Sequence, residues 1–203
     1  MSARRCIVLL LTATLAGCGS SPKTHYFTLA AEPGAAAAKP SIGYPVAVAA
    51  VRLPAALDRR EMVRQSGATT VDVSDQDLWV APLGALSRRV LSDDLAARLA
   101  PGSIVLPDAP QPPHTRRIVV VLDRFGPGGA GEAVLKGSWS LLEDKTGKPV
   151  LQREVALDTA ALPGGEGQAT AMSHLLGQLA AEMAAVLSEA GQPAGASSSG
   201  GRG

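Results

Sequence analysis

Apolar residues follow two different spacings along the chain, and these spacings predict its secondary structure. Residues 44–53, YPVAVAAVRL, form a nearly continuous Val- and Ala-rich run that ends at Pro54, which is typical of a buried strand. Residues 62–73 carry Ser66-Gly67 between two β-favouring runs and so predict a hairpin. Three further strands are predicted, the last two joined by a turn at residues 144–147, and they cover residues 116–125, 132–142 and 150–157.

Two segments have helical spacing instead. Residues 75–100 place Leu83, Leu86, Val90 and Leu91 on a drifting apolar stripe, and Asp77 is the predicted cap of this helix. Pro82 falls where a first helical turn tolerates proline, and residues 101–113 form a proline-rich loop. Residues 172–187 repeat the spacing in a last helix. The order predicts an α/β fold, a single two-layer domain whose mixed β-sheet, with a β-hairpin, packs against two main helices.

The amino terminus has the pattern of a secretory signal. Arg4 and Arg5 precede an uncharged apolar run at residues 6–15, and small residues then lead to Cys18. A bilayer-spanning helix needs about 20 apolar residues, so this run is too short to span. The segment resembles the lipobox of bacterial lipoproteins, in which the cysteine is acylated and becomes the first mature residue. An ordinary signal peptide with an incidental cysteine and a short hydrophobic helix are the alternatives.

Cleavage before Cys18 would remove Cys6, so Cys18 would be the only cysteine and no intramolecular disulfide could form. Stable anchoring takes about two acyl chains, such as palmitate, on one residue. Residue 19 is Gly rather than Asp, which resembles lipoproteins exported to the outer membrane. We therefore expect a lipid anchor on the periplasmic face of the outer membrane of a Gram-negative bacterium.

Composition predicts four parts for the chain. Residues 1–17 are the expected signal peptide, and residues 18–43 the lipidated cysteine with a tether that is flexible at residues 31–43 after a short ordered piece at residues 26–29. Residues 44–190 are the expected domain. Residues 191–203, GQPAGASSSGGRG, have almost nothing to bury and are expected to be a disordered tail.

No pattern in the sequence predicts a catalytic centre, a metal site or a cofactor. The three histidines, His25, His114 and His174, lack the spacing of metal ligands, and His174 is expected on a helix surface. GPGGAG at residues 126–131 lies between two predicted strands, whereas a phosphate-binding loop leads into a helix. Asp93-Asp94 and Glu143-Asp144 are expected to be solvated. The chain is therefore predicted not to be an enzyme.

Charge also argues against nucleic acid as a partner. The chain carries 19 Lys and Arg against 18 Asp and Glu, and it has no long basic run. Two stretches are less ordinary: LPAALDRR at residues 53–60 sets charges beside apolar residues, and DLWVAPL at residues 77–83 sets a tryptophan just before a helix. Each stretch is open to two interpretations. Asp58 and Arg59 form a capped turn with a local ion pair and Trp79 packs under the helix, or these residues contact a partner.

Together with YFTL, LPAALDRREMVRQ, LWVAPLGALSRRVLSDDLAARL, VLKGSWSLLEDKTGKPV and AMSHLLGQLAAEMAAVL, these stretches resemble the ABC-type transport auxiliary lipoproteins, the paraquat-inducible protein C-like group. The resemblance covers roughly residues 24–190. Ala56 stands where the family often has an aromatic residue, and Ser140 where arginine is common. The motifs that match the family suggest a partner-binding set: Leu57, Asp58, Arg59, Trp79 and Pro82.

The resemblance implies an outer-membrane-anchored subunit of an ABC transport system that moves phospholipid or another lipid between the two membranes and supports envelope integrity. The implied partners are an MCE-domain protein and an inner-membrane ABC or integral membrane component, and a homo-oligomer is plausible for the family. Two alternatives remain. One is an outer-membrane lipoprotein with a structural or regulatory role in the envelope. The other is a hydrolase, which would need a pocket where His174 or His114 meets a carboxylate and a nucleophile.

Overall fold

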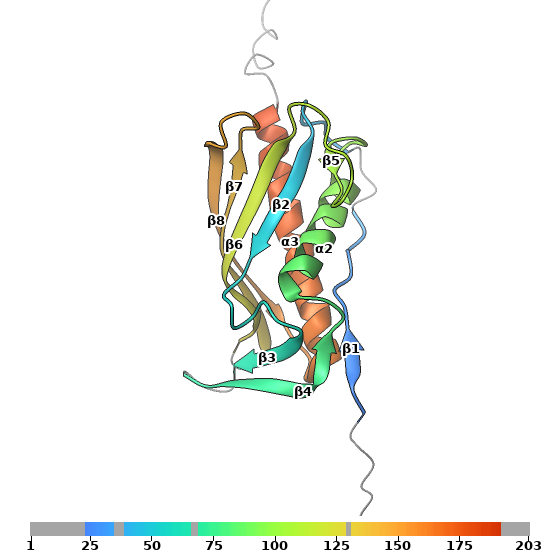
Figure 1. Ribbon diagram of the computed structural model, residues 1–203, viewed down its shortest axis with the longest axis vertical. Coiled ribbons are helices and arrows are strands. Elements are labelled where there is room, and N and C mark those ends of the chain that lie inside the picture. Colours follow the sequence, from blue (N-terminus) through green and yellow to red (C-terminus); the bar gives the residue numbers. More distant parts are fainter. Residues whose placement is uncertain (1–22, 35–38, 66–68, 129–130, 192–203) are drawn as a thin grey trace, which may run out of the picture.

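Strands form two separate sheets, and two long helices lie against the larger one (Figure 1). The computed structural model describes residues 23–34, 39–65, 69–128 and 131–191. The predicted signal peptide, Cys18 and nearly all of the predicted tail lie outside these residues. In chain order the elements are β1 (His25–Phe27), β2 (Val46–Arg52), β3 (Glu61–Gln65), β4 (Val71–Trp79), α2 (Leu83–Arg98), β5 (Ile104–Val105), β6 (Arg116–Pro127), β7 (Glu132–Leu142), β8 (Pro149–Ala160) and α3 (Gly164–Gly191).

The larger sheet has five strands in the order β5-β2-β6-β7-β8. The strands β5 and β6 both run parallel to β2, which lies between them, and β6, β7 and β8 form an antiparallel meander. The smaller sheet has the order β1-β4-β3, in which β1 is parallel to β4 and β3 pairs antiparallel with it. This confirms an α/β fold with a mixed sheet, a hairpin and two helices.

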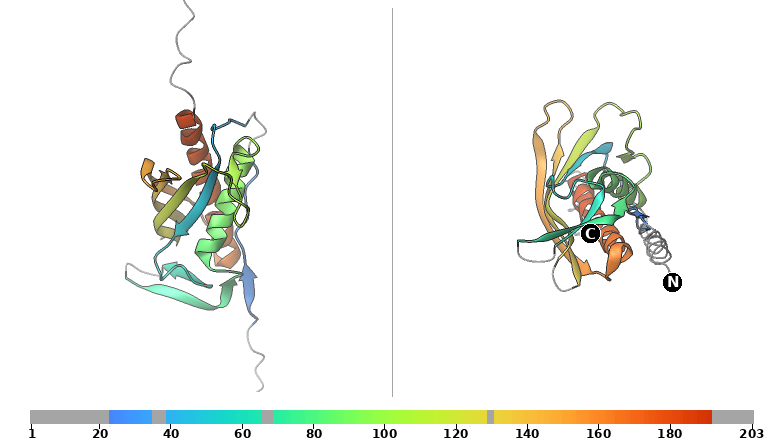
Figure 2. Two further views of the ribbon diagram at one scale, coloured as in Figure 1. Left: turned by 45° about the horizontal axis from the view of Figure 1, so that its top comes forward. Right: turned by 60° about the horizontal axis from the view of Figure 1, so that its bottom comes forward.

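Helices α2 and α3 cover one face of the five-stranded sheet, and the smaller sheet lies across one end of the molecule (Figures 1 and 2). Inward-facing side chains alternate along β6 and β7, as their cross-strand register requires. Ile118 pairs with Leu141 and Val120 with Trp139, and all four are buried against the helices. Most of the core therefore lies between the larger sheet and the helices, and Met62 and Trp79 of the smaller sheet also belong to it.

The helix predicted at residues 75–100 begins later than expected, and this prediction was wrong at its start. Residues 71–79 form β4, because β1 and β3 pair with it on both sides and satisfy its backbone groups. Asp77 consequently caps nothing: its carboxylate meets Arg64 at 2.8 Å and His25 at 3.4 Å within the small sheet. No pattern in the sequence predicted β5, which lies within the predicted proline-rich loop and pairs with β2.

The amino-terminal cap of α2 is supplied by a residue far away in the sequence. Pro82 occupies the N-cap position, has an extended ψ of 137° and makes no side-chain cap. Asp58 instead accepts a hydrogen bond from the backbone N–H of Gly84 at 2.9 Å. A Cβ on residue 84 would lie 3.0 Å from both the Asp58 Oδ1 and the Val51 carbonyl, so glycine permits this close approach. The cap ties the β2–β3 loop to the start of the helix.

The last helix is longer than its apolar pattern indicated. It begins at Gly164, whereas the predicted spacing starts at Met172. Gly165 and Gly167 are buried in its first turns, where a Cβ on Gly165 would run into the ring of Phe27. Close packing against β1 thus stabilises a glycine-rich segment whose intrinsic helix propensity is low.

Residues 25–34, which we call the N-terminal strap, pack along both helices. The backbone N–H of Ala30 donates to Ser173 Oγ at 3.1 Å, and that of Glu32 donates to Asp94 Oδ1 at 2.7 Å. The Glu32 carboxylate meets His174 Nδ1 at 2.7 Å and passes over Gly177, where a Cβ would collide with it. Residues 31–43 were expected to be a flexible tether. Described residues on both sides of positions 35–38 are packed instead: Glu32 lies against the helices and Ile42 lies in the core.

Asp94 is the buried charge of this arrangement, contrary to the expectation that it would be solvated. Its side chain is 0 % exposed and also accepts a hydrogen bond from Arg98 at 3.3 Å, whereas its Oδ2 is buried and has no hydrogen-bond partner among the described residues. Burial raises the pKa of the Asp94 carboxyl above its ordinary value of 3.8, against the opposing effect of the Glu32 N–H and Arg98. Neighbouring Asp93 is nearer the surface and meets Arg89, four residues earlier in the helix, at 3.7 Å.

This raised pKa predicts a pH dependence of stability. Unfolded Asp94 ionises at lower pH than folded Asp94, so ionisation favours unfolding as pH rises above about 4. We expect the free energy of unfolding of the native protein, relative to Asp94→Asn, to fall between pH 4 and 7. Urea denaturation at several pH values measures the difference, with Asp93→Asn as the control for loss of one carboxylate from the same helix. A difference that stays constant or grows with pH would contradict the assignment.

Candidate partner-binding site

The predicted partner-binding residues lie in three segments: the loop between β2 and β3, the end of β4 and the start of α2. These segments meet at one end of the molecule. The loop begins with a tight turn, in which the N–H groups of Leu57 and Asp58 donate to the Pro54 carbonyl at 2.8 and 3.1 Å. The N–H of Arg59 donates to the Leu57 carbonyl at 2.9 Å. These bonds fix the loop backbone and present the side chains of residues 54–59 in one conformation.

Three of the five predicted residues have clear structural roles. Asp58 caps α2 through Gly84, and Pro82 occupies the N-cap position of the same helix. Arg59 forms an ion pair with Glu61 at 2.9 Å, and their hydrogen bond lowers the pKa of the Glu61 carboxyl. Of the capped turn with a local ion pair, one of the two interpretations of the sequence, the ion pair is present and joins Arg59 to Glu61, whereas Asp58 caps the helix α2 rather than the turn.

Trp79 lies inside the protein rather than on a surface. Its side chain is 1 % exposed, because β4 pairs it in register with Phe27 on the inward side of the small sheet. Its backbone N–H donates to the Arg60 carbonyl at 2.6 Å, and Arg60 Nε donates back to the Trp79 carbonyl at 3.4 Å. The tryptophan thus anchors the end of the loop to β4, and its ring offers no contact to a partner in this conformation.

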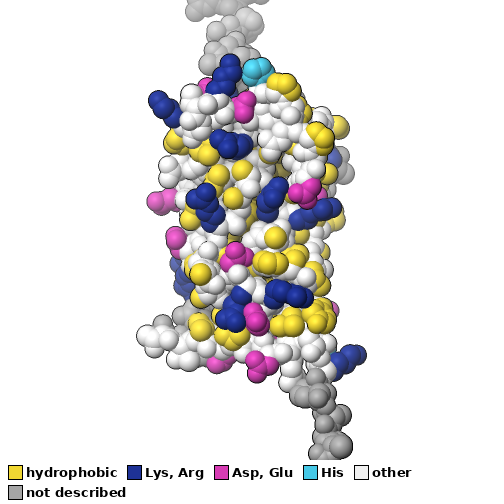
Figure 3. Space-filling view, viewed as in Figure 1, with side chains coloured by type: hydrophobic (Ala, Val, Ile, Leu, Met, Phe, Trp, Pro, Cys, Tyr) yellow, Lys and Arg dark blue, Asp and Glu magenta, His cyan; other side chains and the backbone are white. Residues whose placement is uncertain are grey.

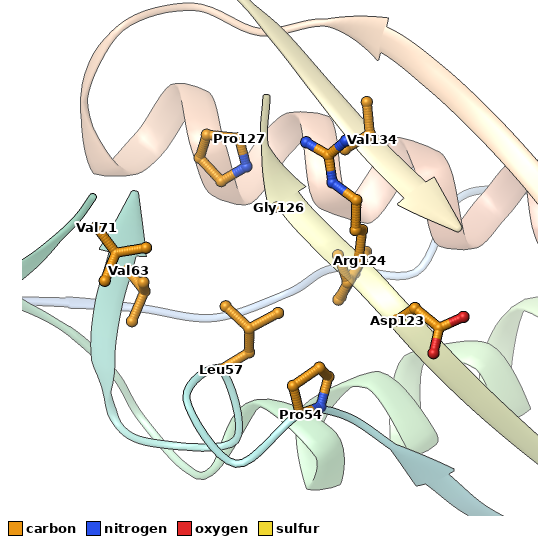
Figure 4. A pocket seen from close by; sticks show the side chains of 10 residues that line it. Pro54, Leu57, Val63, Val71, Asp123, Arg124, Gly126, Pro127 and Val134 are labelled. Atoms are coloured by element: carbon orange, nitrogen blue, oxygen red, sulfur yellow. The ribbon is translucent and has the colours of Figure 1, made fainter. Parts of the chain in front are cut away.

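Leu57 points into a surface pocket that the sequence did not predict (Figure 4). Pro54 and Leu57 come from the loop, Val63 and Val71 from the β3–β4 hairpin, and the end of β6 closes the other side. The pocket has a volume of about 200 Å³. The remaining lining residues are Asp123, Arg124, Phe125, Gly126, Pro127 and Val134.

Size and lining decide what this pocket can hold. Sites for drug-sized ligands usually enclose about 300–1,000 Å³, so this pocket is smaller than such a site. Its walls are mostly aliphatic, proline and phenylalanine side chains. It suits one apolar side chain of a docking protein better than a whole lipid. The signal in the sequence was the pair of apolar residues, Pro54 and Leu57, beside charges.

The histidines form no complete catalytic arrangement in the described part of the chain. His174 meets the carboxylate of Glu32 through Nδ1, as the hydrolase alternative requires, but its Nε2 lies 3.0 Å from the Gln178 amide nitrogen. The described residues contain no group of three His, Cys, Asp or Glu side chains that could hold a metal ion. Within those residues, neither helix combines the length and apolar character needed to cross a bilayer.

Two solved structures resemble this chain in fold. An uncharacterized protein shares 21 % sequence identity with a TM-score of 0.61, and the match covers 83 % of this chain and 98 % of that chain. A protein from Xanthomonas campestris, described as a DUF330 family member, shares 14 % identity with a TM-score of 0.66, covering 82 % of this chain and 96 % of that chain. No curated protein sequence matches significantly.

The sequence of the folded domain gives the family. The model of the ABC-type transport auxiliary lipoprotein component matches residues 27–184, which run from the last residue of β1 into α3. This span includes the β2–β3 loop, the small hairpin, the whole larger sheet, all of α2 and most of α3. The chain therefore belongs to the family of ABC-type transport auxiliary lipoprotein components.

Proposed function

We propose that this protein is an outer-membrane lipoprotein, acylated at Cys18, that serves as the auxiliary subunit of an ABC transport system with an MCE-domain protein. Its system would move phospholipid or another lipid between the inner and outer membranes and so maintain the envelope. The family membership carries this proposal, because it links the chain to ABC transport and to lipoproteins. The lipobox-like residues before Cys18 supply the means of attachment.

The pocket at Leu57 suits a docking role better than cargo binding. Its volume of about 200 Å³ leaves no room for a whole phospholipid, whereas its apolar lining suits a side chain of a partner. We therefore assign the partner contact to Pro54 and Leu57 of the loop, beside the Arg59–Glu61 pair. Asp58, Trp79 and Pro82 would contribute by holding the loop in place.

The same observation also fits the alternative function. An outer-membrane lipoprotein that supports envelope structure, or regulates an envelope enzyme, would likewise dock a protein and hold no lipid. The two functions differ in the partner that the Leu57 pocket captures. An MCE-domain protein supports the transport role.

The anchor gives the first prediction. Cys18→Ser removes the only thiol that can be acylated in the mature chain, so the variant should leave the outer-membrane fraction and carry no acyl label. Membrane fractionation with labelled palmitate measures both. Cys6→Ser, within the predicted signal peptide, is the control and should be processed normally. Cys18→Ser protein that still fractionates with the outer membrane and is still labelled would contradict the anchor.

The docking surface gives the second prediction. Leu57→Ser should reduce recovery of an MCE-domain protein by about tenfold in pull-downs from solubilised envelopes, because loss of an apolar anchor at an interface typically costs 1–2 kcal/mol. Leu106→Ser, at another exposed leucine, is the matched control. Thermal unfolding of both variants shows that they are folded. Native protein that recovers an envelope protein without an MCE domain would favour the alternative function, and equal recovery by both variants would contradict the assignment of the pocket.

A further inference from the structure

The end of the molecule that carries β1 has an exposed apolar patch, which we call the anchor-end patch. It consists of Tyr26, Leu78, Val80 and Pro82. Tyr26 is 59 % exposed and Val80 is 49 % exposed, whereas most large apolar side chains of the described chain are buried. Leu78 is half-buried and Pro82 is exposed beside them.

Strand register places three of these residues on one face. Tyr26 pairs with Leu78 in the parallel β1–β4 ladder, and paired residues of a ladder point to the same side. The next pair, Phe27 and Trp79, points inward to the core. Val80 follows by alternation on the outer side, held there by a hydrogen bond from its N–H to the Phe27 carbonyl at 2.9 Å. The patch is therefore built into the backbone pairing.

Basic side chains flank the patch. Lys23 and Arg60 are exposed near it, and Figure 3 shows hydrophobic side chains at the lower end of this face with basic and acidic side chains among them. Two carboxylates beside the patch are paired, Glu61 with Arg59 and Asp77 with Arg64, and Asp58 accepts the hydrogen bond from the Gly84 N–H. A surface that combines a tyrosine, aliphatic side chains and cations matches the interface between lipid headgroups and acyl chains.

The chain outside the described residues limits where this end can lie. Described residues begin at Lys23, and Figure 1 shows β1 at the lower end, with β8 starting at the opposite end. Only five peptide steps separate Lys23 from Cys18, which reach about 18 Å at most. The 28 residues of α3 extend for about 42 Å. An acylated Cys18 would thus hold the β1 end close to the bilayer.

We propose that the anchor-end patch rests on the same bilayer that carries the acyl chains of Cys18. The inference depends on the proposed acylation and goes beyond it, because it names the protein surface that touches lipid. The domain then stands end-on, with Tyr26 and Val80 in the interface and the β7–β8 turn pointing away from the membrane. The β2–β3 loop lies near the membrane end, so a docked partner would meet the protein close to the bilayer.

A single reporter at each end tests this orientation. The mature chain would have no free thiol once Cys18 is acylated, so Val80→Cys and Val150→Cys each give one site for an environment-sensitive fluorophore. Val150 is the matched control: it is a valine with 51 % exposure, in β8 next to the β7–β8 turn. Tyr26→Cys gives a second reporter within the patch. The acylated proteins are reconstituted on vesicles of phosphatidylethanolamine and phosphatidylglycerol, with and without brominated acyl chains.

We expect the brominated chains to reduce fluorescence at positions 80 and 26 by about twofold and to leave position 150 unchanged, as for residues in and outside the interface. Protein that floats with vesicles but shows no quenching at positions 80 and 26, or equal quenching at position 150, would overturn the patch while leaving the anchor intact. Protein that does not float with vesicles would overturn the acylation and, with it, the patch.

Discussion

The attachment of the N-terminal strap to the two helices constrains the other features of this domain. Within residues 25–34, the backbone N–H groups of Ala30 and Glu32 donate hydrogen bonds to Ser173 of α3 and Asp94 of α2. The Asp94 carboxylate is buried beneath the strap, and Arg98 forms an ion pair with it. A buried charge is costly unless it is paired and hydrogen-bonded, so removal of the strap would leave Asp94 poorly satisfied.

The same strap also connects to the candidate docking site. Phe27 packs beside Trp79 and against the first turns of α3, and Trp79 is bonded through its backbone to the end of the β2–β3 loop. Asp58 then connects this loop to α2. Strand β1, the loop and the helix starts therefore form one continuous structure at one end of the domain. Such an arrangement fits the proposed function, in which a partner-binding loop is held at a defined height above a membrane.

Local patterns in the sequence predicted most of the larger sheet and both helices, because these elements bury regular apolar stripes. The patterns failed where distant pairing decides the structure. Residues 75–79 read as part of a helix, yet β1 and β3 pair with them on both sides. The cap of α2 comes from Asp58 and not from Asp77, and Asp94 is buried by a strap sixty residues away in sequence. Of the proposed site residues, Leu57 could be named from its motif. The pocket that it lines could not be predicted, because its walls come from four separate segments: the β2–β3 loop, the β3–β4 hairpin, β6 and β7.

Amide hydrogen exchange along the strap measures most directly whether the strap is attached to the helices. The N–H groups of Ala30, Glu32 and Val80 are bonded to Ser173, Asp94 and Phe27. We expect all three N–H groups to exchange far more slowly than those of an unstructured peptide, and to lose this protection only when the fold opens. Exchange at the rate of a free chain would show that the strap is not part of the domain, and would contradict the account.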